Sequence, residues 1–220
     1  MEEHEVDPQS AASAMPKREL PRTAKGRRTR HAILEAARVC FGETGYTGTR
    51  IQDITERAGL SLGAFYRYFD SRREVLLAIL AEFFDSLYKS SRSPWRADDP
   101  GHSVRETTLL YLEGYSMNAD LYRLAYETFL TDPDVNRIMD DARHMFYRRI
   151  ERSLRRGQAA GQVREEVDCA LSAALLGGMA EQYAFSAFVV RSSGVSVNLE
   201  KVADEISALW IGGVAIDGPN

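Results

Sequence analysis

The chain has 220 residues, 44% apolar and 27% charged, which is enough to bury one ordinary domain or a small module and a larger body. Two cysteines and a formal net charge of −4 exclude a disulfide-rich scaffold and a wholly basic protein, and we expect reduced core thiols at Cys40 and Cys169. The start lacks the apolar stretch of a signal peptide. Glu181 and Gln182 interrupt the apolar run over 170–190, so we expect an interface helix of a cytoplasmic protein rather than a membrane span.

Charge is distributed unevenly along the chain. Residues 17–73 hold 13 lysines and arginines against 6 acidic residues, a net charge of +7. Residues 1–16 carry −4 and residues 74–220 carry −7. A basic segment within an acidic chain is suited to a polyanion such as nucleic acid.

The helical periodicity begins after a tail that we expect to be disordered over residues 1–24. Apolar residues between Ile33 and Phe41 fall on one face of a first helix, and Gly45 is a candidate stop. Thr49 and Gln52 have the spacing of a capping box, so a second helix is expected to begin near Arg50.

Gly59 is expected to end the second helix in the left-handed conformation. Ser61 is a candidate cap for a short third helix over 62–69. Ser71 and Glu74 form another capping-box pattern before a long fourth helix. Further helices are expected at roughly 103–117, 120–130, 134–156, 167–191 and 198–214, which predicts an all-α fold of about nine helices.

The second and third helices, with the glycine turn between them, form a candidate helix-turn-helix. Phe65 and Phe69 are four residues apart and are expected to face the core. The outward positions are then Leu62, Gly63, Ala64, Tyr66, Arg67 and Tyr68. Tyrosine hydroxyls can bond phosphates, Arg67 can pair with guanine, and the small Gly63 and Ala64 allow close approach to base edges.

The stretch "GYTGTRIQDITERAGLSLGAFYRYFDSRREVL" resembles the DNA-binding domain of the tetracycline-repressor family of transcriptional regulators, over about residues 27–77. The resemblance implies a dimeric, all-helical protein with a ligand pocket in its C-terminal body. It also implies phosphate contacts from Thr49, Tyr66, Tyr68 and Arg72, and base contacts near Leu62, Gly63, Ala64 and Arg67. Leu62 and Gln52 depart from the residues often found in such proteins, so Arg50 and Arg67 are expected to compensate.

These features predict a DNA-binding domain over 25–73 and a ligand-binding and dimerisation domain over 74–220. A helix-turn-helix pattern also occurs in helical hairpins that bind no DNA, but the +7 charge and the resemblance favour DNA. The basic arm that includes Arg27 and Arg28 is either a solvated tail or an added phosphate or minor-groove contact, and its position beside the motif favours the contact.

The body is rich in tyrosine, phenylalanine and methionine, a composition typical both of ordinary core packing and of an adaptable apolar pocket. With the resemblance, we expect a hydrophobic or aromatic small-molecule effector. The candidate ligand-binding residues are Tyr111, Tyr115, Tyr126, Phe129, Met139, Phe146, Met179 and Tyr183.

The last two helices are rich in small and aliphatic residues. The pair Gly177 and Gly178 would allow two helices to approach closely, either within one chain or, as the resemblance implies, across a four-helix homodimer interface. The candidate interface residues are Leu175, Gly178, Met179, Ile206, Leu209 and Trp210.

An enzyme is disfavoured by the motifs. Asp141 and His144 are three residues apart, as in helical di-metal sites, but such sites need this element twice. No catalytic or metal-binding residue is therefore predicted, and no cofactor. We expect a repressor that leaves a near-palindromic operator when its effector binds. The alternative is a DNA-binding organiser without a small-molecule effector, acting through a protein partner.

Overall fold

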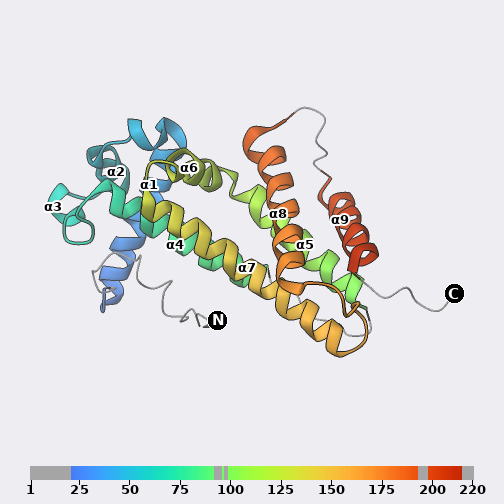
Figure 1. The fold of residues 1–220 in the computed structure, drawn as a ribbon. Helices are drawn as coiled ribbons and strands as arrows, with labels where there is room; N and C mark the ends of the chain where they lie inside the picture. Colours follow the sequence, from blue (N-terminus) through green and yellow to red (C-terminus); the bar gives the residue numbers. More distant parts are fainter. Residues whose placement is uncertain (1–20, 92–95, 97–98, 193–197, 215–220) are drawn as a thin grey trace. The chain divides into compact units, whose positions relative to one another are not determined.

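The computed structural model describes residues 21–91, 96, 99–192 and 198–214, and most of the predicted tail lies outside them. The predicted all-α fold is confirmed (Figure 1). The elements are α1 (Ala24–Gly48), α2 (Ile51–Ala58), α3 (Leu62–Phe65), α4 (Arg72–Ser90), α5 (Pro100–Met117), α6 (Ala119–Phe129), α7 (Pro133–Ala159), α8 (Cys169–Ala184), the π-helix η2 (Phe185–Val190) and α9 (Leu199–Val214).

Local signals in the sequence set most of the helix ends. Gly59 has φ 64° and ends α2 in the left-handed conformation, and the Ser61 hydroxyl accepts from the Ala64 N–H at 3.2 Å. The expected capping box of Thr49 and Gln52 is wrong by one residue. The carboxylate of Asp53, rather than Gln52, accepts from the Arg50 N–H at 2.7 Å, so α2 begins at Ile51.

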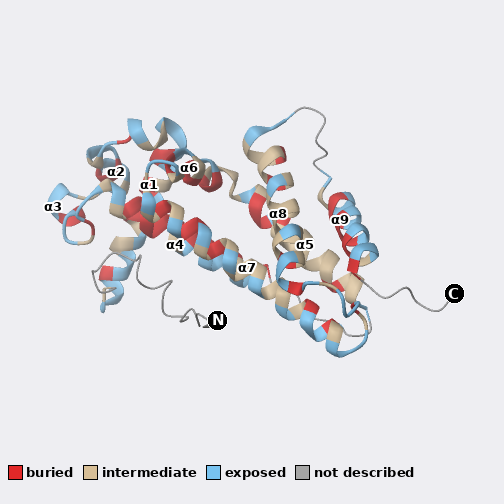
Figure 2. Ribbon diagram, viewed as in Figure 1, coloured by how far each residue is buried: buried red, intermediate tan, exposed pale blue. Residues whose placement is uncertain are grey.

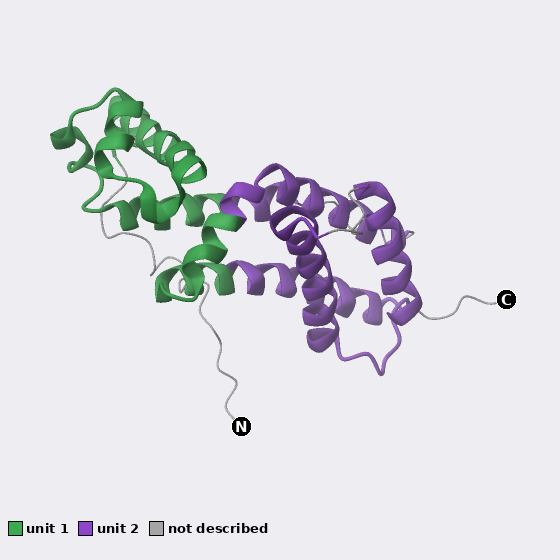
Figure 3. Cartoon of the chain, turned by 90° about the horizontal axis from the view of Figure 1, so that it is seen from above, with its two compact units in different colours: residues 1–84, 123–141 green, residues 85–122, 142–220 purple. Residues whose placement is uncertain are grey.

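The chain forms two compact units, coloured separately in Figure 3. Unit 1 comprises residues 1–84 and 123–141, and unit 2 comprises 85–122 and 142–220. This grouping differs from the division at residue 73 that we expected. The beginning of α7 packs with the N-terminal helices in unit 1, where Arg73 of α4 bonds Asp132 and Asp134.

The core of unit 1 supports the helix-turn-helix. In Figure 2 the inner faces of α1, α2 and α4 contain buried residues. Phe65 is 0% exposed and Phe69 is 1% exposed, which confirms that both face the core. Ile33, Ile54 and Leu76 of the same unit are also fully buried, and the Phe65 and Phe69 rings lie 6.0 Å apart, so two aromatic side chains anchor α3 and the turn after it.

Unit 2 is built around α5, which packs against α9 and α8. One buried cluster joins the end of α7 to α8 and α9, through Leu154, Val163, Cys169, Ala173, Trp210 and Val214. Both cysteines are buried, as expected, and neither is part of a disulfide. Trp210 is 4% exposed and Ile206 is 8% exposed, so these two side chains stabilise the chain's own core rather than the surface where we had expected them.

The glycine pair of α8 has two different surroundings. A Cβ on Gly177 would lie 2.4 Å from the Tyr147 ring of α7, which is closer than any normal contact. A Cβ on Gly178 would meet only the Tyr147 hydroxyl, at 3.8 Å. Gly177 is therefore required for the approach of α7 and α8 within one chain.

The close approach at Gly177 predicts that an added methyl group there destabilises the chain. Gly177→Ala is expected to lower the free energy of unfolding by about 1–3 kcal/mol, because overpacking displaces the ring or the helix. Gly42→Ala is the control, because a Cβ at this exposed position of α1 meets nothing within 4 Å, and it is expected to be neutral or to stabilise by up to about 1 kcal/mol. Urea unfolding measures both variants. Equal stabilities would contradict the close approach of α8 to Tyr147.

Candidate nucleic-acid interface

The helix-turn-helix consists of α2, the turn at Gly59 and α3. Helix α3 is only four residues long, shorter than the expected 62–69, and the chain continues as a turn over Tyr66, Arg67 and Tyr68. The N–H groups of Tyr68 and Phe69 donate to the Phe65 carbonyl at 2.8 and 3.1 Å, so this turn remains ordered by hydrogen bonds. The segment presents a compact, well-defined surface despite its short helix.

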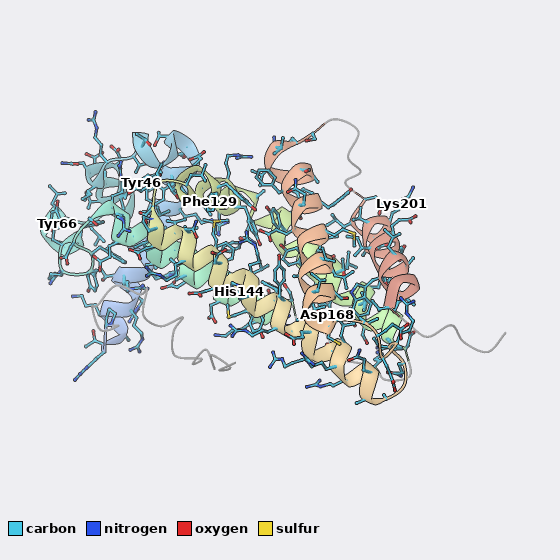
Figure 4. The ribbon with its side chains drawn as sticks, viewed as in Figure 1. Tyr46, Tyr66, Phe129, His144, Asp168 and Lys201 are labelled. Carbon is cyan, nitrogen blue, oxygen red and sulfur yellow. The ribbon has the colours of Figure 1, made fainter. Side chains whose placement is uncertain are left out.

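One side of α3 and its following turn is exposed. Leu62 is 41% exposed and Tyr66 is 48% exposed, and Gly63 and Arg67 are also exposed. Figure 4 labels Tyr66 at this outer surface. No heavy atom lies within 4 Å of a Cβ built on Gly63, so the backbone there is open to a close partner. Among the described residues Arg67 makes no ion pair.

Ala64 and Tyr68 differ from the outward positions that we expected. Ala64 is 9% exposed, because it lies on the inner side of α3 together with the buried Phe65. Tyr68 is half-buried, and its hydroxyl lies 3.7 Å from the position of a Cβ on Gly26 in α1. These two residues contribute to packing beneath the exposed surface, and Tyr68 connects it to the first turn of α1.

Thr49 and Arg72 hold the connection between α1 and α2. Thr49 is fully buried, and its hydroxyl bonds the Gly45 carbonyl and the Thr44 hydroxyl, both at 2.9 Å. Arg72 donates to the carbonyls of Thr47 and Thr49, and its guanidinium lies 4.4 Å from the centre of the Tyr46 ring. Thr49 and Arg72, for which the resemblance implies phosphate contacts, thus position the start of α2 in this structure.

The arm at the start of α1 is basic and exposed. Arg27 and Arg28 are both exposed, and the Thr23 hydroxyl caps the helix by accepting from the Gly26 N–H at 3.0 Å. Arg27 also donates to the Arg22 carbonyl at 2.7 Å. The exposed arm and the exposed residues of α3 belong to the same unit, and together they supply cationic groups for a polyanion.

A forked ion pair joins the start of α4 to the start of α7. Arg73 donates to both carboxylate oxygens of Asp132 at 2.6 Å and to Asp134 at 2.7 Å, which raises the pKa of Arg73. Burial alone would raise the pKa of Asp132. Hydrogen bonds from Arg73 and from the N–H groups of Asp134 and Val135 outweigh it, and lower that pKa below its ordinary value.

The candidate ligand residues fall in both units. Tyr126, Phe129 and Met139 belong to unit 1, where the Tyr126 and Phe129 rings are 6.2 Å apart. Those of unit 2 are Tyr111, Tyr115, Phe146, Met179 and Tyr183. The Tyr111 ring lies 5.3 Å from Phe146 and 6.0 Å from Tyr115.

Not all of these aromatic residues are available to a ligand. Tyr115 is fully buried and stacks on Tyr122 with ring centres 3.5 Å apart, and burial raises the pKa of Tyr122 well above its ordinary value. Tyr111, Phe146, Met179 and Tyr183 remain half-buried. Tyr115 is therefore better described as a support for the neighbouring aromatic residues.

The sequence did not reveal a half-buried ion pair in unit 2. Arg143 of α7 donates to both carboxylate oxygens of Glu181 of α8, each at 2.9 Å. The only local signal is the presence of Glu181 within an apolar helix, and nothing in the sequence identifies a partner 38 residues away. The described residues contain no group of three histidine, cysteine or acidic side chains suited to a metal ion.

An apolar surface follows α8 and α9. Leu171, Leu175 and Leu209 are 57%, 65% and 66% exposed, whereas Gly178 and Met179 are half-buried. The described segment Cys169–Val190 is long and apolar enough to cross a membrane by length and composition. Only 17% of its most apolar 18-residue stretch is buried within the chain. Large exposed apolar side chains on adjoining helices are typical of a protein interface.

Residues 33–79 match the family model described as bacterial regulatory proteins, tetR family. The transcriptional activator FasR of Mycolicibacterium smegmatis is 30% identical over 118 residues, which cover 53% of this chain and 52% of FasR. The repressor KstR2 of Rhodococcus jostii is 37% identical over 67 residues, covering 30% of this chain and 32% of KstR2. The chain thus spans about half the length of these curated relatives, or less.

The fold extends the likeness over most of the chain. SmeT, the repressor of the Stenotrophomonas maltophilia multidrug efflux pump SmeDEF, superposes with a TM-score of 0.68 and 25% identity. The superposition covers 86% of this chain and 91% of SmeT. SmeT in complex with triclosan gives a TM-score of 0.66 and 27% identity, over 87% of this chain and 93% of that one. The resemblance that the sequence predicts is confirmed.

The forked ion pair predicts a coupling between α4 and α7. In a double-mutant cycle at neutral pH, Arg73→Ala and Asp132→Ala are expected to show a coupling of about 1 kcal/mol, since the pair is forked and Asp132 is mostly shielded. The contribution of Asp132 is present above the unfolded pKa of about 4. It is lost as the pH falls through the lower folded pKa.

Lys89 and Asp85 provide the control, because this exposed pair lies within one helix. Its coupling is expected to be about 0.3–0.5 kcal/mol. Urea unfolding at neutral and acid pH measures both cycles. A coupling for Arg73 and Asp132 no larger than the control would show that the fork does not join the two helices energetically.

Proposed function

We propose that the protein is a DNA-binding transcriptional regulator of the tetracycline-repressor type, most simply a cytoplasmic repressor. The observation that carries this proposal is the exposed surface of Gly63, Tyr66 and Arg67, which lies on aromatic anchors within the segment that matches the family model. A helix-turn-helix of this kind inserts its second helix into the major groove.

In this proposal the contacts divide by chemistry. Arg67 and the open backbone at Gly63 face base edges, with Leu62 beside them. Tyr66, Arg50 and the arm residues Arg27 and Arg28 contact phosphates or the minor groove. Four residues support the DNA-contacting surface without touching DNA themselves, because their side chains pack in the unit or bond backbone carbonyls: Thr49, Ala64, Tyr68 and Arg72.

The proposed assembly is a homodimer on a near-palindromic operator. Its interface uses Leu171, Leu175 and Leu209, together with the half-buried Gly178 and Met179. Two recognition helices read successive major grooves only when they are about 34–36 Å apart, or a multiple of that distance. The distance between the two recognition helices of the dimer therefore determines how tightly it binds the operator.

The proposed effector is a small hydrophobic or aromatic molecule that binds the C-terminal body. The half-buried Tyr111, Phe146, Met179 and Tyr183 support this ligand class, and SmeT forms a complex with triclosan. The effector would bind more tightly to dimers whose two recognition helices are too far apart or too close for the operator. By linkage, it then lowers DNA affinity by the ratio of its affinities for the two arrangements.

The alternative is a DNA-binding organiser that acts through a protein partner. Under the first proposal, a hydrophobic molecule that raises the melting temperature also releases operator DNA. Under the alternative, stabilising molecules leave DNA affinity unchanged.

The DNA-reading role predicts a loss of base preference in one variant. Arg67→Ala is expected to weaken operator binding by about 1–3 kcal/mol, because a guanidinium pairs bidentately with guanine. Arg137→Ala is the control, since this exposed arginine on α7 is paired with Asp134 at 2.9 Å. Fluorescence titration with operator and base-substituted duplexes compares the two. Unchanged affinity and base preference in Arg67→Ala would remove its reading role.

The apolar surface predicts dimers at micromolar concentration. Leu175→Glu with Leu209→Glu is expected to yield monomers, because four carboxylates per dimer would be buried without partners. Met117→Glu is the control, as Met117 is 73% exposed on α5. Sedimentation measures the mass of each. A folded monomer for the unchanged protein, or a dimer for the double variant, would contradict this interface.

A further inference from the structure

The second half of α7 carries a positive charge within an acidic body. Residues 142–160 hold six arginines and one glutamate, a net charge of +5, whereas the rest of residues 74–220 has a net charge of −12. The segment contains no lysine, so its permanent positive charges are all guanidinium groups. The charge is therefore concentrated in one helix, and its chemistry is that of the guanidinium group.

Three of these arginines have roles inside unit 2. Arg143 bonds Glu181, and Arg155 bonds Glu151 of the preceding turn. Arg149 donates to the Ser91 carbonyl and lies 3.8 Å from the centre of the Tyr88 ring, so it closes the end of α4. Half of the six arginines thus have a structural role within unit 2.

The other three form what we call the arginine stripe, Arg148, Arg152 and Arg156. All three are exposed and follow one another at intervals of four residues, which in a helix places them about 6 Å apart along the axis. Figure 4 labels His144, one turn earlier on the same helix, which is exposed as well. The stripe thus presents three guanidinium groups over about 12 Å.

The stripe makes few contacts of its own. Among the described residues Arg148 and Arg156 make no side-chain hydrogen bond or ion pair. Arg152 donates to the Arg148 carbonyl at 3.2 Å and to the Tyr88 hydroxyl at 3.5 Å, and neither acceptor is a carboxylate. The positive charge of the stripe is therefore not neutralised by the described side chains.

The surroundings of the stripe distinguish between kinds of partner. Residues 142–160 include no large exposed apolar side chain. A protein interface has an apolar core, and a helix that lies on a membrane has an apolar face, so both partners would need what this segment lacks. Contact with a nucleic-acid backbone needs only cations, and guanidinium forks match phosphate geometry.

We propose that the arginine stripe is a second contact for the phosphate backbone of double-stranded DNA, in addition to the helix-turn-helix. It is independent of base sequence, because it offers charge without side chains placed to read base edges. This inference goes beyond the proposed function, since it requires neither an operator nor an effector. The stripe would hold non-operator DNA, or a second DNA segment beside the operator.

The test uses the full chain and a non-operator duplex. In the variant R148Q/R152Q/R156Q, the slope of log K against log salt is expected to fall by roughly 2.7, since each lost phosphate contact removes about 0.9. The control R123Q/R137Q/R191Q removes the same charge from exposed positions elsewhere. It is expected to change the slope by less than about 1. Circular dichroism and melting temperature confirm that both variants fold.

Equal slopes for the two triple variants would overturn the proposal. Loss of binding to anionic phosphatidylserine vesicles by the stripe variant, with DNA binding equal to the control, would also overturn it and assign the surface to a membrane. The proposal is supported if the stripe variant keeps its operator base preference while its slope of log K against log salt on the non-operator duplex decreases. Arg67→Ala should show the reverse, an altered base preference with an almost unchanged non-operator slope, so the failure of either site is distinguishable.

Discussion

The burial of Phe65 and Phe69 is the interaction on which the candidate DNA surface depends. A four-residue helix has no stability in isolation, because helix nucleation costs more than so few hydrogen bonds return. The two rings are almost fully buried in unit 1, and they fix both the direction of α3 and its rotation about its axis. With the inner side fixed in this way, Gly63, Tyr66 and Arg67 remain on the outer side.

The polar contacts around α3 serve the same purpose at its two ends. Ser61 caps its start, and Gly59 supplies the turn before it. Beyond its end, Arg72 holds the connection between α1 and α2 through backbone carbonyls, and Arg73 joins α4 to the start of α7. Two adjacent arginines that resemble DNA contacts by charge thus stabilise the unit that carries the contacts. Charge alone does not identify a phosphate-binding residue.

The sequence predicted what is encoded locally, and missed what depends on distant residues. The order of the helices, the turn at Gly59 and the inward Phe65 and Phe69 follow from neighbours three or four residues apart, although α3 ends at Phe65, earlier than expected. The inward positions of Ala64 and Trp210 were missed, because they depend on how separate helices pack. The same holds for the Arg143–Glu181 pair, whose members are 38 residues apart. Periodicity identifies the apolar face of a helix, but not whether its own chain or another covers that face.

Selection from a random pool of duplexes determines whether the exposed side of α3 reads DNA, as we propose. The unchanged protein is expected to enrich a near-palindromic sequence, with half-sites separated by about one helical turn or a multiple of it. A variant with Gly63→Glu, which adds a carboxylate at an open position without disturbing the core, should enrich nothing. The same enriched sequence from both proteins, or none from the unchanged protein, would show that the exposed side of α3 does not read DNA.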